Sequence, residues 1–234
     1  MESAQVLLAQ FAVYGRFYEK TIAGVPESLR DRLEIAPRAM PLAEMVVREP
    51  DLLVVMMNPG ASKPLDALWD EGGHQGFVAA QPDRTQYQIM RLMLAAQGLG
   101  LPWLHARILN LSDLRTPKSE LFIKKLNEYS SDDSHSLFSN QRADERAALF
   151  ATVKTPVLLG WGLNAGFASL AQSALAAAQG HPLLGMSDDG LRYRHPLPQR
   201  HDLQVQWLAQ ITRQLGPIKP RAMQIASMAV NSMA

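Results

Sequence analysis

Short, continuous apolar runs alternate with amphipathic stretches along most of the chain. The apolar runs lie at residues 51–57, 106–112, 156–162 and 181–187, and most are bounded by Gly, Pro or Asn. Such runs are typical of strands that are covered on both faces, as in a parallel sheet. Stretches with apolar residues at helical spacing predict helices at residues 3–22, 26–33, 41–49, 84–100, 116–129, 140–153, 164–180 and 202–216. This alternation predicts an α/β protein with three layers, α/β/α, around a central, mostly parallel four-stranded sheet.

The same pattern divides the chain into three parts. Residues 1–50 are expected to form an N-terminal helical segment packed on the core, and residues 51–216 the α/β core domain. Residues 217–234 are a tail rich in Met and Ala, for which docking and disorder are equally open. Residues 60–84 are rich in Gly, Pro and Asp and show no period, which predicts a long loop.

Composition excludes several classes of protein. The 234 residues are 47% hydrophobic and 19% charged, as in an ordinary globular protein, and the formal net charge is +1. The chain has no cysteine, so disulfides, thiol nucleophiles and cysteine-bound metals are excluded. The first residues lack a basic secretory leader, and no apolar run reaches the ~18 residues of a membrane span. We expect a cytoplasmic protein that does not enter a membrane.

Polar residues follow the predicted strands at their carboxyl ends. The first strand leads into "MMNPGAS" with Asn58, the second into "ILNLS" with Asn110, and the third into the glycines of "LLGWG". The segment "RHPLPQR" with His195 follows the fourth strand. Because ligands of α/β proteins bind outside the carboxyl ends of the strands, these side chains are expected to gather at one site.

Four quoted segments, in this order, resemble a family of uncharacterised bacterial and phage proteins, the DUF1643 family. They are "MMNPGAS", "ILNLSDLRTPKS", "LLGWGLNAG" and "RHPLPQR", and the resemblance covers roughly residues 50–200. "QPDRTQYQIMR" stands where that family has a helix start, which places Asp83 and Thr85 there. The family implies no known chemistry.

The same segments are similar, more distantly, to the uracil-DNA glycosylase-like superfamily, which implies a fold of that type. In that superfamily "MMNPG" would be the motif that positions water, with Asn58 as the catalytic residue and Pro59 and Gly60 beside the substrate. "RILN" would place Asn110 where an asparagine reads the edge of the base. "RHPLP" would place His195 where a histidine stabilises the leaving base. The resemblance therefore implies a nucleobase- or nucleotide-recognising protein with hydrolytic N-glycosylase activity on nucleic acid.

Two departures from that pattern keep alternatives open. Leu197 stands where the superfamily has a serine, and no aromatic residue follows "NPG" to stack on a base, so Phe77 or Trp69 would have to substitute. A non-enzymatic nucleic-acid- or nucleotide-binding module on the same fold is one alternative. A scaffold that binds a protein partner through the Met-rich tail is another.

Each candidate residue also has a structural explanation. Asn58 could serve a turn, Asn110 could cap a loop, and His195 could make a structural hydrogen bond. Asp83 and Thr85 could be helix N-caps. The other candidates for substrate binding are two glycines, a tryptophan that suits a core or a pocket wall, and an arginine that could contact phosphate: Gly160, Gly162, Trp161 and Arg194. No metal-ligand spacing, phosphate loop or dinucleotide motif is present, so no metal or cofactor is predicted.

Overall fold

The computed structural model describes residues 1–66 and 76–216 and contains one mixed sheet of seven strands. The strand order is β4-β1-β2-β5-β3-β6-β7. The strands span Phe11–Ile22 (β1), Val25–Pro37 (β2), Leu52–Met56 (β3), Gly76–Ala79 (β4), Ala106–Asn110 (β5), Val157–Gly160 (β6) and Leu183–Leu184 (β7). Strands β5, β3, β6 and β7 are parallel, whereas β1, β2 and β4 run antiparallel to their neighbours. The α/β class is confirmed, and the parallel part has four strands, but the predicted total of four strands was wrong.

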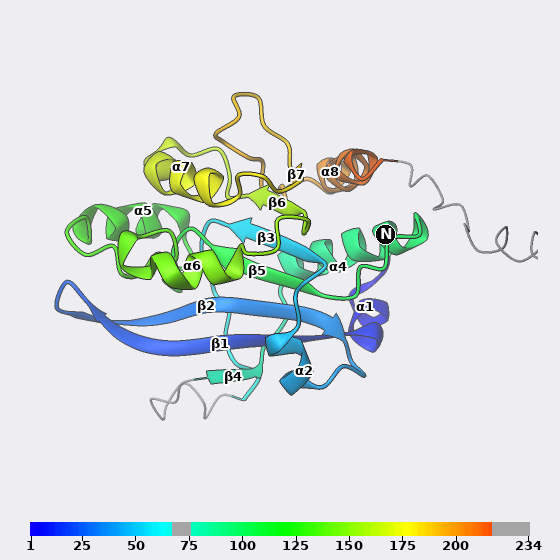
Figure 1. Cartoon of the computed structure of the whole chain (residues 1–234), viewed down its shortest axis with the longest axis horizontal. Helices are drawn as coiled ribbons and strands as arrows, with labels where there is room; N and C mark the ends of the chain where they lie inside the picture. Colours follow the sequence, from blue (N-terminus) through cyan, green and yellow to red (C-terminus); the bar gives the residue numbers. More distant parts are fainter. Residues whose placement is uncertain (67–75, 217–234) are drawn as a thin grey trace, which may run out of the picture.

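Helices cover both faces of the sheet and divide the core into two clusters. Side chains from α1 (Ala4–Gln10), α4 (Arg84–Gly98) and α8 (His201–Gln214) pack with one set of strand residues. Side chains from α5 (Ser119–Glu128), α6 (Ala143–Leu149) and α7 (Ala168–Ala177) pack with the alternate set. Figure 1 shows the green and yellow helices along one side of the sheet and α4 behind it. The short helix α2 (Leu42–Val47) connects β2 to β3.

The N-terminal segment is mainly a long β-hairpin, so the predicted helices at residues 3–22 and 26–33 were wrong beyond Gln10 (Figure 1). Buried residues alternate along β1, as in Phe11, Val13 and Phe17, and this period of two outweighs the helical spacing. Ala23 and Gly24 both have positive φ, 47° and 83°, and form the two-residue turn that suits the twist of a hairpin. The first fifty residues therefore extend the sheet of the core.

A β-bulge interrupts the hairpin and changes the direction of one side chain. Arg16 pairs with Arg32 and Phe17 pairs with Arg30, so Asp31 has no opposite residue. A bulge shifts the alternation of side chains between the two faces of a sheet. Arg30 therefore lies on the face of Phe17, whereas the Asp31 carboxylate accepts a hydrogen bond from Nε of Arg16.

Most elements of the core match their predicted positions, with three differences. Strand β4 lies within the predicted loop at 60–84 and pairs with β1. Helix α5 begins at Ser119 rather than at Thr116, and its N-cap position is Lys118. The helix predicted at 140–153 is a 3-10 turn, Asn140–Arg142, followed by α6. Trp69 and the tail at 217–234 lie outside the described residues.

Candidate functional site

A cavity of about 200 Å³, here called the small cavity, opens at the carboxyl ends of β3 and β5. It brings together seven of the residues predicted from the sequence, which come from four separate segments of the chain. These residues are Asn58, Pro59, Gly60, Asp83, Thr85, Asn110 and His195. The other residues of its wall are Arg30, Met56, Met57, Gln86, Ile108 and Pro117.

Asn110 is a fully buried amide that has no hydrogen-bond partner. It is the last residue of β5, its side chain is 0% exposed, and both Nδ2 and Oδ1 are unpaired among the described residues. Leaving a buried polar group unpaired costs roughly 1–3 kcal/mol, so such groups are rare unless a ligand or water serves them. The amide offers a donor and an acceptor side by side, which suits a lactam or amide edge.

Asn58 is held in one orientation by the backbone of a neighbouring loop. Its Nδ2 donates to the carbonyl oxygens of Leu114, at 3.2 Å, and Thr116, at 2.7 Å. The donor end of the amide is therefore committed to the protein, and only Oδ1 can serve a ligand or a water molecule. This oxygen can accept a hydrogen bond but cannot donate one. Asn58 thus has a structural role, and its remaining chemistry is that of an acceptor.

His195 is a neutral imidazole with its second nitrogen free to donate. Burial lowers the pKa of His195, although the contact of Nδ1 with the Leu197 carbonyl oxygen, at 3.4 Å, and the carboxylate of Asp83 both oppose this shift. The Leu197 N–H donates to Nδ1 at 3.1 Å, which places the proton of the neutral ring on Nε2. The ring lines the small cavity and can offer it one N–H.

Asp83 and Gln86 form a capping box at the start of α4. Oδ1 of Asp83 accepts hydrogen bonds from the backbone N–H groups of Thr85 and Gln86, and Oε1 of Gln86 accepts from the Asp83 N–H. The structural explanation is therefore correct for Asp83, while Thr85 is the helical residue that it caps. Asp83 and Thr85 also line the small cavity, so the start of α4 forms part of its wall.

The segment at residues 160–162 supports the site rather than lining the small cavity. A Cβ at Gly160 would lie 2.9 Å from Cδ of Pro196, so only glycine permits this approach next to His195. Trp161 is 1% exposed, and its Nε1 donates to the Leu191 carbonyl, which makes it a core residue. The Gly162 N–H donates to the carbonyl of Tyr193 at 2.7 Å.

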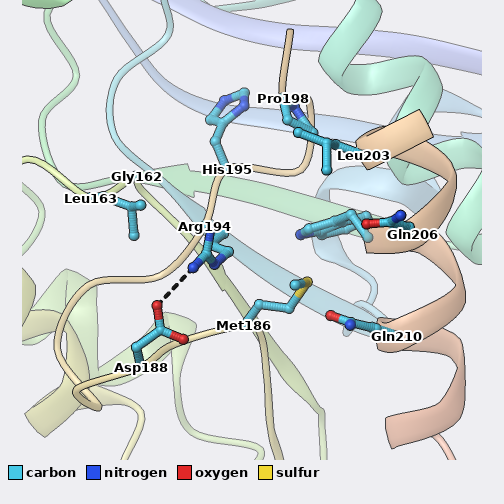
Figure 2. A pocket seen from close by; sticks show the side chains of 11 residues that line it. Gly162, Leu163, Met186, Asp188, Arg194, His195, Pro198, Leu203, Gln206 and Gln210 are labelled. Carbon is cyan, nitrogen blue, oxygen red and sulfur yellow. Dashed lines mark hydrogen bonds and ion pairs between the residues drawn. The ribbon is translucent and has the colours of Figure 1, made fainter. Parts of the chain in front are cut away.

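A second cavity of about 590 Å³, here called the large cavity, begins on the other side of His195 (Figure 2). Its wall comes from the loop after β6, from the segment before His195 and from α8. These parts include Gly162, Met186 and Trp207 respectively. Arg194 lines it and forms an ion pair with Asp188 at 2.7 Å, drawn as the dashed line in Figure 2. Arg194 therefore lies in the neighbouring cavity and not in the small one.

Arg30 is a residue of the small cavity that sequence reasoning missed. It is 2% exposed, and its side chain has no hydrogen bond or ion pair among the described residues. Burial lowers its pKa to about 10. The apolar alternation of Phe11, Val13 and Phe17 was the signal that could have predicted a hairpin here, but it would not have shown which face Arg30 occupies.

A network of buried charges lies behind Arg30 on the opposite face of β2. Arg142 forms ion pairs with Asp113 and Asp31, and Tyr18 donates a hydrogen bond to Asp113 at 3.0 Å. Burial raises the pKa of Asp113 to about 7, the neighbouring Arg142 opposing the shift. None of these four side chains lines the small cavity. The network therefore holds the hairpin to the core. Its acidic residues are bound by other side chains, and none of them forms an ion pair with Arg30.

Two features are absent from the described residues, 1–66 and 76–216. No group of three or more His, Asp or Glu side chains there could hold a metal ion. In the same residues no helix has both the length and the apolar character needed to cross a bilayer.

Comparisons with known proteins do not assign the chain to a family. No family model and no curated protein matches it. Among solved structures, a serine-to-alanine mutant of the feruloyl esterase module from Clostridium thermocellum, complexed with sinapinate, is similar with a TM-score of 0.32 and 8% identity. The match covers 92% of this chain and 66% of that chain, slightly under two thirds of the module. A similarity this low carries no argument about the site.

Proposed function

We propose that the protein recognises a nucleobase in the small cavity and hydrolyses its N-glycosidic bond. The observation that carries this proposal is Asn110, whose buried amide is unpaired at both atoms in a cavity that Asn58 and His195 also line. A pyrimidine or oxopurine edge carries adjacent donors and acceptors, which would satisfy both ends of that amide. The distant resemblance to the uracil-DNA glycosylase-like superfamily, which includes the segments of Asn58, Asn110 and His195, supports the same assignment.

The roles follow from what each side chain has left to offer. Hydrolysis of an N-glycosidic bond develops positive charge on the sugar and negative charge on the leaving base. Oδ1 of Asn58 would accept a hydrogen bond from the attacking water and orient it, but an amide is too weak a base to deprotonate that water. The bond between sugar and base would therefore break first, with its electron pair leaving on the base, and the water that adds to the sugar would lose its proton to the departing base or to solvent. Nε2–H of His195 would donate to the oxygen of the leaving base. Asn110 would hold the edge of the base.

The apolar walls fit a planar ring, and the large cavity fits the remainder of a substrate. Met56 and Ile108 line the small cavity beside its polar groups and can contact the faces of a base. The large cavity lies beyond His195 and carries Arg194 at its edge, where a phosphate could bind. A nucleotide within a nucleic acid is the substrate that we propose.

A non-enzymatic binding module is the second candidate, and one observation favours it. None of the residues that line the small cavity is Phe, Tyr or Trp, so the stacking that usually holds a flipped base is missing from its described wall. Phe77, the expected substitute, lies elsewhere, with Arg32 stacked on its ring at 4.7 Å. A module on this fold would bind the base or nucleotide and release it unchanged.

Single-turnover base release separates the two candidates. Single-stranded and duplex oligonucleotides that carry uracil, mismatched or alkylated bases would be incubated with the wild-type protein and with Asn110→Leu and His195→Gln. We expect release by the wild type and a loss of ~100-fold or more in each variant. Leucine is close in size to asparagine and removes two unpaired buried polar atoms, so Asn110→Leu should fold at least as stably as the wild type.

The control is Gln88→Met, in the core of α4. The Gln88 amide donates to the Gln204 carbonyl at 2.9 Å, and Gln88 does not line either cavity. This variant should lose stability and keep the wild-type release rate. Binding of a nucleoside or nucleotide without release from any substrate would favour the binding module. If the protein neither binds a nucleoside or nucleotide nor releases a base, both candidates are contradicted.

A further inference from the structure

Arg30 is a buried cation that no described residue neutralises through an ion pair. Two other arginines with little exposure are paired. The buried Arg107 contacts Glu34 at 2.8 Å, and the partly buried Arg142 contacts Asp113. Arg30 has neither an ion pair nor a side-chain hydrogen bond among the described residues, although its Nε and Nη1 are buried. Buried charges in proteins are nearly always paired, so this exception among the described residues points to a ligand as the partner.

None of the described acidic residues around Arg30 serves as its permanent counter-ion. The bulge at Asp31 separates the two residues onto different faces, and the carboxylate of Asp31 is bound by Arg16. Asp83 is an exposed helix cap, and Asp113 lies in the network behind the strand. Both carboxylates favour the charged form of Arg30, yet neither forms an ion pair with it. The side chain therefore stays cationic at neutral pH and lines a small cavity without a partner.

We propose that Arg30 is the anion-binding residue of the small cavity, and that the ligand presents a negatively charged oxygen to it. A guanidinium is a planar set of N–H donors that fits two oxygens of a phosphate, or the oxygen of an ionised base, better than any neutral group. Beside it, Asn110 would pair with an adjacent amide-type edge and His195 would donate to a second oxygen. Two sources share this chemistry: the phosphate of a nucleotide, and a nucleobase whose lactam has lost its proton.

The inference rests on the proposed function only in giving the small cavity to a nucleotide or base. Binding is therefore the quantity to measure, because it does not require base release. Anion binding without base release would contradict the glycosylase and leave this inference intact. If an Arg30 variant releases the base at the wild-type rate, this inference would be contradicted and the glycosylase would stand.

Calorimetric titration of the full chain tests the inference with three probes at neutral pH. Inorganic phosphate represents the phosphate source, 5-nitrouracil represents the ionised base, and uracil is the uncharged comparison for 5-nitrouracil. We expect the wild type to bind phosphate, or to bind 5-nitrouracil at least ~10-fold more tightly than uracil, and Arg30→Met to weaken that binding by ~10-fold or more. Phosphate binding alone would identify the phosphate as the source, and a preference for 5-nitrouracil alone would identify the base.

Two further variants keep the result interpretable. Arg32→Met changes the same residue type two positions along β2, where the side chain packs on Phe77 and contacts Glu34 at 3.7 Å, outside the small cavity. It should bind the anion as the wild type does. Arg30→Gln removes the charge and keeps a polar side chain, and it replaces Arg30→Met if that variant does not fold.

A melting experiment without ligand adds a readout that a structural arginine would not give. Removal of an unpaired buried charge should raise the melting temperature of Arg30→Met by roughly 2–4 °C. Failure of the folded wild type to bind either anion would overturn the inference. Equal anion affinity in the wild type and in the folded Arg30 variant would overturn it as well.

Discussion

At the scale of single residues, the small cavity is defined by hydrogen-bonding groups that the fold leaves unused. Asn110 keeps both ends of its amide, Asn58 keeps only an acceptor, and His195 keeps one N–H. Arg30 adds a charge. Each unused group lowers the stability of the empty protein, which is a cost that binding sites commonly carry. The combination would suit a small ligand that both donates and accepts hydrogen bonds.

The protonation of His195 gives a testable dependence of stability on pH. Burial lowers the pKa of His195, so the unfolded chain takes up this proton at a higher pH than the folded protein does. Stability must then fall as the pH decreases through the ordinary histidine range near ~6.5, and it rises as the pH increases. The free energy of unfolding of the wild type, minus that of His195→Gln, should therefore decrease from pH ~7.5 to pH ~5.5. Urea unfolding of both proteins measures it, and a difference that stays constant or grows would contradict the assignment.

At the scale of elements, the sequence patterns predicted the parallel part of the sheet well and the hairpin poorly. Strands β3, β5 and β6 are short apolar runs bounded by strong turn residues, so their carboxyl ends, with Asn58 and Asn110, could be located from the sequence. Strands β1 and β2 mix charged and apolar residues over a length that also fits helices. The alternation of Phe11, Val13 and Phe17 is a local sign of a strand, but the long-range pairing that stabilises the hairpin is not visible in a local pattern.

The burial of Arg30 was unpredictable for the same reason. Its position depends on the bulge at Asp31 and on the pairing of β2 with β5, which joins residues far apart in the chain. Nothing in "SLRDRLEI" distinguishes the arginine that enters the cavity from the one that packs on Phe77. Candidates at strand ends can be found from the sequence, whereas a residue brought to the site from a neighbouring strand requires the structure.

Close approach at the end of β6 gives a prediction about how His195 is held. In Gly160→Ala the new Cβ would lie 2.9 Å from Cδ of Pro196 and 3.3 Å from Sδ of Met56. We expect a loss of roughly 1–3 kcal/mol in the free energy of unfolding, because the segment carrying His195 must move. Ligand binding to the small cavity should also be weaker in Gly160→Ala, because His195 lines that cavity.

The matched control makes the same substitution where space is available. Gly98 is the last residue of α4, and a Cβ there meets no atom within 4 Å. Gly98→Ala should therefore raise the free energy of unfolding by up to ~1 kcal/mol, since alanine favours a helix. Urea unfolding of both variants tests the pair, and a loss of equal size in each would show that the contact with Pro196 is not the cause.

At the scale of the whole molecule, the hairpin and the parallel strands form one sheet with a shared core. The cluster on the face of α4 contains six apolar side chains from the first fifty residues, which pack with residues of β3 and β5. These six are Leu7, Phe11, Val13, Phe17, Leu33 and Ile35. Removal of residues 1–50 would expose the edge of β5 as well as this surface.

We therefore expect the fragment 51–234 to lack cooperative unfolding. At roughly 2–5 kcal/mol for each side chain, the loss of six of them costs as much as, or more than, the roughly 5–15 kcal/mol by which domains are usually stable. Far-UV circular dichroism during urea titration measures the transition. Co-expression with a fragment of residues 1–50 should restore it, which would show that the missing strands are the cause. A cooperative transition of wild-type strength in 51–234 alone would contradict the prediction.

The small cavity takes its wall from six separate segments of the chain, and Arg30, Asn58, Asn110 and His195 each lie on a different one. Every one of those segments must be in place before the cavity exists, so a partly folded chain has no version of it. A ligand would therefore bind the native state and leave the folding transition state untouched. Its effect would be on the unfolding rate, which should slow in proportion to occupancy while the folding rate stays constant. The bound protein would differ from the free one chiefly in how long each molecule remains folded.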